Sequence, residues 1–288
     1  MPLVSIVNEI RKAQAGGYCL PLFLTYDMAS TEGIFQALEE KQSPAMVGVY
    51  STWFDLPGAT AVTTMVRTMA GAGRAPISLM LDHGDTIEQC VKALARGFTD
   101  VMYDGSKLPL EENIANTKFI VRAAHAVGAG VEAELGHVGQ GAEYDTYGGA
   151  GKGFTDPAVA ERFVAETGVD ILAVAIGNAH GVYRGEPRLN VDLLREIRRR
   201  VPVPLSLHGG TGLSDEQFRA AIGGGVAKVN IFTDLSLAAA AGVADLCKAG
   251  PPSYFDVVGA IREAFRQRCC RYVEVFGSAG RARTIRCQ

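Results

Sequence analysis

The feature that most constrains the fold of this chain is an alternation of short apolar runs with longer amphipathic stretches. The runs are apolar on both faces, as strands of a parallel sheet covered by helices are; they span 19–23, 45–49, 77–81, 100–102, 130–134, 171–175, 204–207 and 227–231. Helical patterns separate them at 31–41, 59–69, 86–95, 111–127, 157–167, 191–200 and 215–222. Eight such units predict an α/β fold, the (β/α)8 or TIM barrel. A doubly wound open sheet is the structural alternative, because strand counting does not separate the two.

Two segments interrupt this rhythm. The stretch 136–154 is rich in glycine and polar residues and is too long for a tight connection, which predicts a mobile active-site loop. After the last strand come an alanine-rich helix, a bend at Pro251-Pro252 and a long helix from 255 to about 276. We expect this helical extension to pack on the barrel or on a neighbouring subunit. The chain has 288 residues, close to the length of one barrel, so 1–288 is expected to be a single domain.

Charge and hydropathy exclude several partners. The formal net charge is −3, which offers no electrostatic reason to expect nucleic acid or an anionic membrane surface. No apolar run is as long as a bilayer span, and residues 1–12 lack the apolar core of a signal peptide. The sequence therefore predicts a cytoplasmic protein with no membrane and no nucleic-acid partner.

Three of the five histidines share one setting, directly beyond an apolar run and before a glycine. They occur in LDHG (His83), IGNAHG (His180) and LSLHG (His208). Because the carboxyl ends of all barrel strands meet at one face, these side chains can converge. Three neutral imidazoles with an open fourth position are typical of a catalytic zinc site. A hydrogen-bonded structural role is the alternative for each; the repeated setting, with Asp82 beside one of them, favours the metal.

Two glycine-rich or hydroxyl-bearing turns follow the last two strands. HGGTG begins at His208, and NIFTD begins at Asn230 and leads into a helix. Glycines let backbone N–H groups approach a phosphate, and a helix N-terminus favours its negative charge. Phosphate sites after the last strands recur in this fold. The turns therefore predict a phosphorylated small-molecule ligand.

Together these residues resemble the class II fructose- and tagatose-bisphosphate aldolases over nearly the whole chain. The stretches that carry the resemblance are LDHGDTIEQCVKALARGFTDVMYDGS, ENIANTKFIVRAAHAVGAGVEAELG, VDILAVAIGNAHGVY, VPLSLHGGTGL, GGGVAKVNIFTDL and VFGSAGRA. The resemblance implies a homodimer or homotetramer that acts on a sugar phosphate. It implies Zn²⁺ on His83, His180 and His208, with a monovalent cation, Na⁺ or K⁺, near the phosphate.

The resemblance also implies roles for individual residues. Asp82 would exchange a proton with the C4 hydroxyl, Glu134 would lie near the metal, and Asn230 would steady the enediolate. The phosphate of dihydroxyacetone phosphate would be held by Gly181, Gly209, Thr211 and Thr233. The family takes the acid that exchanges the donor-carbon proton from its mobile loop, and Glu143 is the candidate here.

The part of the site that would bind the aldehyde, which is the acceptor in the synthesis direction, departs from the family pattern. Asp27 stands where relatives carry asparagine, Tyr50 where they carry serine (Ser51 is adjacent), and Phe232 where they carry aspartate. The family's phosphate-binding arginine has no counterpart between Arg219 and Arg262. Since a phosphate dianion needs a cationic partner, we hypothesise a ketose phosphate whose aldehyde half lacks the second phosphate. Misalignment, with Arg262 swinging in, is the alternative, and would leave a standard fructose-1,6- or tagatose-1,6-bisphosphate aldolase.

Other functions are also compatible with parts of the pattern. Lys228 is the only lysine in an expected strand and would be the Schiff-base residue of a class I aldolase. A metal-free sugar-phosphate isomerase would use the same phosphate turns but would not need the three histidines. A non-catalytic aldolase-like subunit would tolerate the altered acceptor half.

Overall fold

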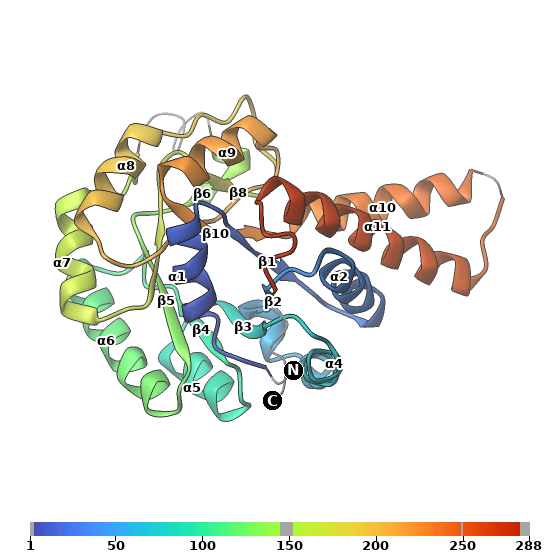
Figure 1. Ribbon diagram of the computed structural model, residues 1–288, viewed down its shortest axis with the longest axis horizontal. Helices are drawn as coiled ribbons and strands as arrows, with labels where there is room; N and C mark the ends of the chain where they lie inside the picture. The colour runs from blue at the N-terminus through green and yellow to red at the C-terminus, as the bar shows by residue number, and fades with distance from the viewer. Residues whose placement is uncertain (1–2, 145–151, 249, 283–288) are drawn as a thin grey trace.

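The computed structural model describes residues 3–144, 152–248 and 250–282. Eight parallel strands close into a barrel in the order β1-β10-β9-β7-β5-β4-β3-β2, which confirms the predicted (β/α)8 barrel (Figure 1). The strands are β1 (Leu20–Leu24), β2 (Ala45–Tyr50), β3 (Ile77–Gly84), β4 (Asp100–Tyr103), β5 (Gly130–Leu135), β7 (Ile171–Val174), β9 (Leu205–Leu207) and β10 (Val226–Ile231). A small parallel sheet pairs β6 (Gly139–Gln140) with β8 (Ala179–His180).

Helices connect the strands and form the outer layer. They are α2 (Met28–Lys41), α4 (Pro57–Ala72), α5 (Ile87–Ala95), α6 (Leu110–Ala126), α7 (Pro157–Thr167), α8 (Val191–Arg200) and α9 (Asp215–Gly224), each close to its predicted bounds. The 3-10 helix η1 (Gly141–Glu143) follows β6. Within the described residues, no helix is both long and apolar enough to cross a lipid bilayer.

Besides η1, two α-helices were not predicted from the sequence. The helix α1 (Val7–Gly16) lies across the N-terminal end of the barrel, where Ile6, Ile10 and Ala13 pack against interior strand residues. The single turn α3 (Ser51–Phe54) directly follows β2. Both helices are short and have few apolar residues, so their formation depends more on packing against the barrel than on a helical pattern in their sequence.

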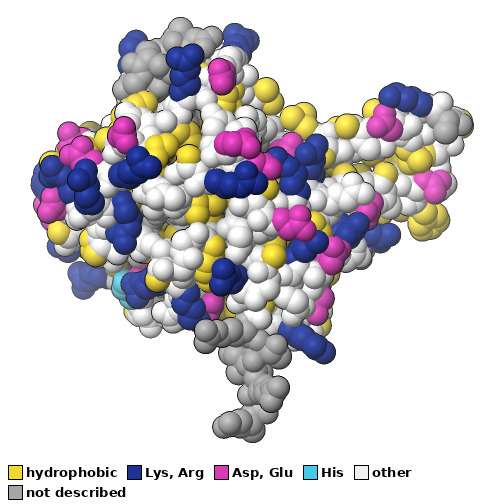
Figure 2. All heavy atoms as spheres, turned by 45° about the horizontal axis from the view of Figure 1, so that its top comes forward, with side chains coloured by type: hydrophobic (Ala, Val, Ile, Leu, Met, Phe, Trp, Pro, Cys, Tyr) yellow, Lys and Arg dark blue, Asp and Glu magenta, His cyan; other side chains and the backbone are white. Residues whose placement is uncertain are grey.

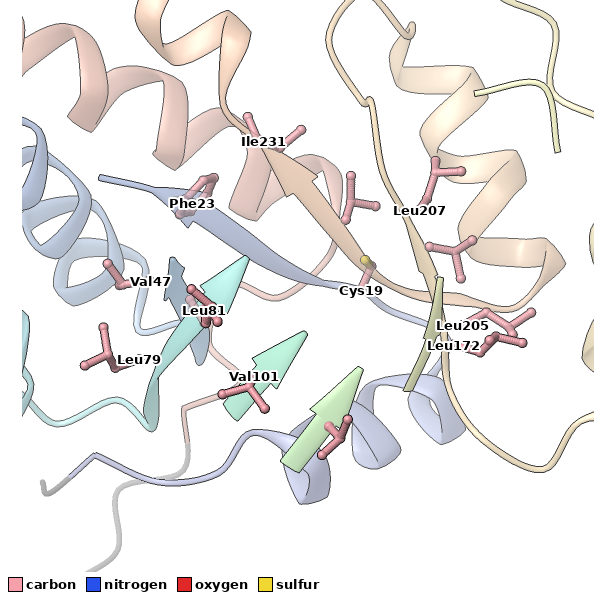
Figure 3. Close-up of a cluster of buried hydrophobic side chains, with 14 of the residues drawn as sticks. Cys19, Phe23, Val47, Leu79, Leu81, Val101, Leu172, Leu205, Leu207 and Ile231 are labelled. Atoms are coloured by element: carbon pink, nitrogen blue, oxygen red, sulfur yellow. The ribbon is translucent and has the colours of Figure 1, made fainter. Parts of the chain in front are cut away.

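The strands alternate between two apolar layers. On β1, Phe23 belongs to the cluster between barrel and helices, whereas Leu22 belongs to the cluster inside the barrel. Figure 3 shows the outer cluster, in which Leu81, Leu207 and Ile231 lie on different strands. Both faces of each strand are thus buried, which is why the strands are almost uniformly apolar in sequence.

The extension forms a helical hairpin of α10 (Thr233–Cys247) and α11 (Tyr254–Val275), which projects from the barrel (Figures 1 and 2). The inner part of α11 packs against α2. A side chain at Gly33 of α2 would contact the backbone of Arg262, so glycine permits this close approach. The predicted extension is therefore present, and it packs on the barrel layer at its base.

Candidate active site

Three imidazoles meet at the carboxyl ends of the barrel strands. His83 lies at the end of β3, His180 in β8, and His208 directly after β9. One ring nitrogen of each lies within 4.8 Å of the others, and the ring centroids are 4.6, 4.9 and 5.9 Å apart. The structure brings together the three histidines that the sequence singled out.

The backbone at His83 is unusual. Its φ of 51° lies in the left-handed region, and the β3–β4 register shifts between Leu81 and Gly84. Successive strand residues normally point to opposite faces. This break in the alternation lets the neighbours Asp82 and His83 both line the same cavity. A β-bulge or strained residue of this kind is common beside active sites.

Carboxylates orient two of the imidazole rings. His83 Nδ1 lies 2.7 Å from Asp104 Oδ2, and His208 Nε2 lies 2.7 Å from Glu132 Oε1. The opposite nitrogens, His83 Nε2 and His208 Nδ1, face each other at 2.9 Å. His180 Nε2 is buried with no hydrogen-bond partner among the described residues. Carboxylate-oriented imidazoles and an orphaned ring nitrogen fit a metal site.

The electrostatics also fit a cation at this point. Burial, with His83 and His208 nearby, lowers the pKa of His180 well below its ordinary value, so its lone pair is free for a ligand bond. Burial alone would lower the pKa of His83, but Asp82 and Asp104 outweigh it and raise this pKa to about 9. Burial raises the pKa of Glu134 to about 8, with Asp104 adding to the shift.

Asp82, Asp104 and Glu134 lie around the imidazole of His83, and this group of acids favours a positive charge there. Glu134 Oε2 is a further buried oxygen without a hydrogen-bond partner in the described chain. His83, Asp104 and Glu134 form a second group of possible metal-binding atoms, which shares His83 with the first. Nitrogen and carboxylate donors around one point suit zinc among the common divalent metals.

A buried ion pair lies beneath the imidazoles. Lys228 Nζ donates to Glu132 Oε1 at 3.1 Å; it is 2.9 Å from Oε2, where the geometry is too poor for a hydrogen bond. The same ammonium donates to Asn230 Oδ1, and Asn230 Nδ2 donates to Asp82 Oδ1 at 2.8 Å. Lys228 is fully buried and committed to these partners. This geometry disfavours Lys228 as a Schiff-base amine.

His83 and His180 line a cavity of about 420 Å³, and His208 is fully buried beside them. Its lining includes almost all of the predicted donor-side residues: Asp82, Glu134, Asn230, Gly181, Gly209, Thr211 and Thr233. Gly209 has a φ of 69°, and a side chain there would strike the carbonyl oxygen of Ala179, so the turn requires glycine. Thr233 is the first residue of α10, whose N-terminus therefore faces the cavity.

Only some of the residues predicted for the acceptor side line the cavity. Tyr50 and Phe232 line the cavity. Asp27 does not: it caps α2 by accepting from the Ser30 N–H at 2.8 Å. Glu143 belongs to η1, but its side chain lies outside the described residues. Arg262 does not swing in either, because it pairs with Glu32 at 3.0 Å and is not among the lining residues.

Several site residues were missed at the level of the sequence. Asp104 follows β4 as the histidines follow their strands, so the same signal could have found it. Glu132 is a charged residue inside an apolar strand, which by itself demands a buried partner. Trp53 and Lys107 also line the cavity, and nothing in their local sequence indicates this.

Comparison with known proteins agrees with this geometry. Residues 4–281 match the family model described as "Fructose-bisphosphate aldolase class-II". The chain is 38% identical to the fructose-bisphosphate aldolase of Geobacillus stearothermophilus, covering 98% of this chain and 99% of that protein. It is 37% identical to the fructose-bisphosphate aldolase of Thermus caldophilus, covering 97% and 100%. The crystal structure of the YdjI aldolase from Escherichia coli K12 is similar at a TM-score of 0.87 and 34% identity, covering 98% and 100%. The chain therefore belongs to the class II fructose-bisphosphate aldolase family, and it is an aldolase.

Proposed function

We propose that this aldolase is a zinc enzyme that reversibly cleaves a ketose 1-phosphate to dihydroxyacetone phosphate and an aldehyde without a second phosphate. The observation that supports it best is the composition of one cavity. His83, His180, Asp82 and the glycine–threonine turns line it, and the fully buried His208 contacts His83 directly behind this lining. No arginine is among its described lining residues.

His83, His180 and His208 would hold the zinc ion. Their facing nitrogens, the orphaned His180 Nε2 and the carboxylate of Asp104 that orients the His83 ring support this assignment. When bound, zinc would supply Lewis-acid stabilisation of the negative charge that develops on the donor oxygens as the C3–C4 bond breaks.

Asp82 is our candidate for the proton transfer at C4. Its Oδ1 is fixed by the amide of Asn230, while its other oxygen has no hydrogen bond within the described residues. In cleavage, that oxygen takes the proton of the C4 hydroxyl as the carbonyl forms, and the C3–C4 electron pair passes to the donor carbon. In synthesis the proton returns. Asn230 would also steady the enediolate by its amide.

Two glutamates complete the donor chemistry. Glu134 lies in the cavity beside His83, where burial favours its neutral form. It would hold a donor oxygen near the metal. The donor carbon must also gain a proton before release, and Glu143 is the residue we assign to that exchange. Its place in η1, directly after β6 and therefore close in sequence to the β6–β8 sheet that carries His180, is compatible with this role.

The phosphate of the donor would bind at Gly181, Gly209, Thr211 and Thr233. Positive φ at Gly181 and Gly209 lets backbone N–H groups turn toward the cavity, and α10 begins at Thr233. A monovalent cation, Na⁺ or K⁺, would offset the remaining charge there.

The acceptor side lacks the usual cation. Arg262 is held by Glu32, and Phe232 and Tyr50 occupy the wall where an anionic group would need donors. The second candidate is a standard fructose-1,6- or tagatose-1,6-bisphosphate aldolase, which the names of the curated relatives favour.

A coupled assay for dihydroxyacetone phosphate release separates the two. A panel of ketose 1-phosphates and 1,6-bisphosphates is compared with and without a chelator. We expect chelation to stop turnover, zinc to restore it, and the monophosphates to react faster. A specificity constant near ~10⁵ M⁻¹s⁻¹ or above for fructose 1,6-bisphosphate, typical of efficient enzymes, would contradict the acceptor proposal and leave the second candidate.

We also expect a homodimer or homotetramer. The projecting α10–α11 hairpin carries large exposed apolar side chains, including Leu237 (50%), Tyr254 (72%) and Phe255 (81%). Such side chains are typical of an interface. Light scattering of the purified protein tests this expectation, and a monomer at micromolar concentration would contradict it.

A further inference from the structure

One side of the active-site cavity is built from aromatic rings. Tyr50 ends β2, Trp53 lies in α3, and Phe232 follows β10; all three line the cavity, and we call them the aromatic wall. The Trp53 ring centroid is 5.6 Å from that of Tyr50 and 5.5 Å from that of Phe232. The rings therefore form one continuous surface from three different elements.

The aromatic wall lies next to the proposed metal ligands, and a further aromatic side chain packs against it. Tyr50 approaches the imidazole of His83 at 6.0 Å between centroids, so the wall begins beside the proposed metal ligands. Tyr26 packs on the wall through Trp53 and Phe232, at 4.8 Å from the latter. Each of the three wall residues is partly exposed, which leaves ring surface available to a ligand.

Charge around the wall opposes an anion. Within the described chain, Lys107 is the one lysine that lines the cavity, and no arginine does. Asp85 also lines it and accepts from Ser51 Oγ at 3.2 Å, which fixes a negative charge next to α3. The faces of aromatic rings carry negative potential and stack on C–H groups. A phosphate dianion would find no matched partner on this surface.

We propose that the aromatic wall is the acceptor subsite and that it selects an uncharged aldehyde with a C–H-rich chain beyond the carbonyl carbon. This inference rests on the proposed function, because it takes the donor phosphate to be held by the glycine–threonine turns. Burying one methylene on the wall improves binding by about fourfold. The specificity constant for synthesis therefore rises by about that factor for each methylene that reaches the rings.

The test compares two reactions of the zinc-loaded enzyme. Exchange of the donor-carbon hydrogen of dihydroxyacetone phosphate in D₂O needs no acceptor and reports on the donor side alone. Synthesis is then measured with ethanal, propanal, butanal and pentanal, and with glyceraldehyde 3-phosphate. Absence of exchange in the wild type would overturn the proposed function and this inference with it. Exchange with a flat aldehyde series, or with the phosphorylated aldehyde preferred, would overturn the inference alone.

Substitutions test whether the aromatic wall causes the preference for longer aldehydes. Trp53→Ala and Phe232→Leu are expected to flatten the aldehyde series. The dihydroxyacetone phosphate exchange rate of each variant is measured alongside, so that any change on the donor side is separated from the loss of chain-length preference. Phe119→Ala, a change to an exposed ring on α6, is the matched control and keeps the series. Lys107→Met tests an anionic acceptor: if it lowers the preferred activity and the wall variants do not, the inference is wrong.

A binding readout complements the kinetics. Trp53 is the only tryptophan of the chain, so intrinsic fluorescence reports on the wall. Titration with the unreactive alcohols of the same chain lengths is expected to change this fluorescence, with tighter binding for longer chains. No change in Trp53 fluorescence up to the solubility of pentan-1-ol would overturn the assignment.

Discussion

The ion pair beneath the imidazoles allows a quantitative test of how the site is held together. Glu132 and Lys228 are both fully buried, 2.9 Å apart, and each also holds a site residue, His208 and Asn230 respectively. Removing one partner leaves an uncompensated charge in the interior, which costs about 3–5 kcal/mol. Removing both avoids that penalty. We therefore expect Glu132→Gln and Lys228→Met each to lose this amount of unfolding free energy, and the double variant to lose no more than either single variant.

The assay is urea unfolding of the four metal-free proteins at pH 7, because a bound cation would add its own stabilisation. The expected coupling free energy is about 3 kcal/mol or more. The exposed pair Arg162–Glu111 serves as the control, and its cycle should show far weaker coupling because solvent screens it. Losses at Glu132 and Lys228 that simply add, within about 0.5 kcal/mol, would refute the reasoning.

The same pair predicts a pH dependence. Burial alone would raise the pKa of Glu132, but Lys228 and His208 outweigh it and lower this pKa to about 2. A carboxyl whose folded pKa is depressed stabilises the protein above its unfolded pKa, ordinarily about 4.3. That stabilisation is lost as the pH falls toward 2. The stability difference between the wild type and Glu132→Gln should therefore be constant near pH 7 and shrink below about pH 4.

Two further predictions concern single residues of the cavity. Asp82→Asn should lower the rate of ketose phosphate cleavage by about 10²–10⁴-fold, because an amide oxygen cannot take the C4 proton; unchanged zinc content and unfolding free energy are the controls, and a loss below about tenfold would speak against the assigned role. Gly209→Ala should cost at least about 1 kcal/mol of unfolding free energy and weaken phosphate binding, because of its positive φ and the carbonyl of Ala179. Gly223→Ala, in α9 with open space around it, is the matched control and should not destabilise; equal effects of the two changes would contradict this account.

Local patterns in the sequence indicated the fold and the three histidines, and the family resemblance supplied the remaining donor-side residues. Apolar runs of strand length between amphipathic stretches indicate a parallel sheet covered by helices on both faces. Eight such units favour the barrel, and the strand order of the structure excludes the open sheet. In that fold, a residue just beyond a strand end has a known location. His83, His180 and His208 could therefore be assigned to one face of the barrel from their positions in the sequence alone.

Other features depend on contacts that no local pattern contains. The helix α1 forms because it closes the end of the barrel, and α3 forms where β2 ends. Asp27 matched a family position by alignment, yet it serves as the cap of α2. The roles of Glu132, Lys228 and Asp104 depend on hydrogen-bond partners from other strands, which the local sequence does not reveal.

The sequence by itself thus determined the alternation of buried strands and covering helices, the strand ends at which the site lies and the residue types available there. It could do so because strand ends and glycine turns are local properties. The tertiary structure decided which side chains share the cavity. Left-handed backbone at His83 turns two neighbours to one side, a buried ion pair supports the imidazoles, and three elements join their rings into the aromatic wall. These are properties of packing between distant segments, and packing depends on the whole chain.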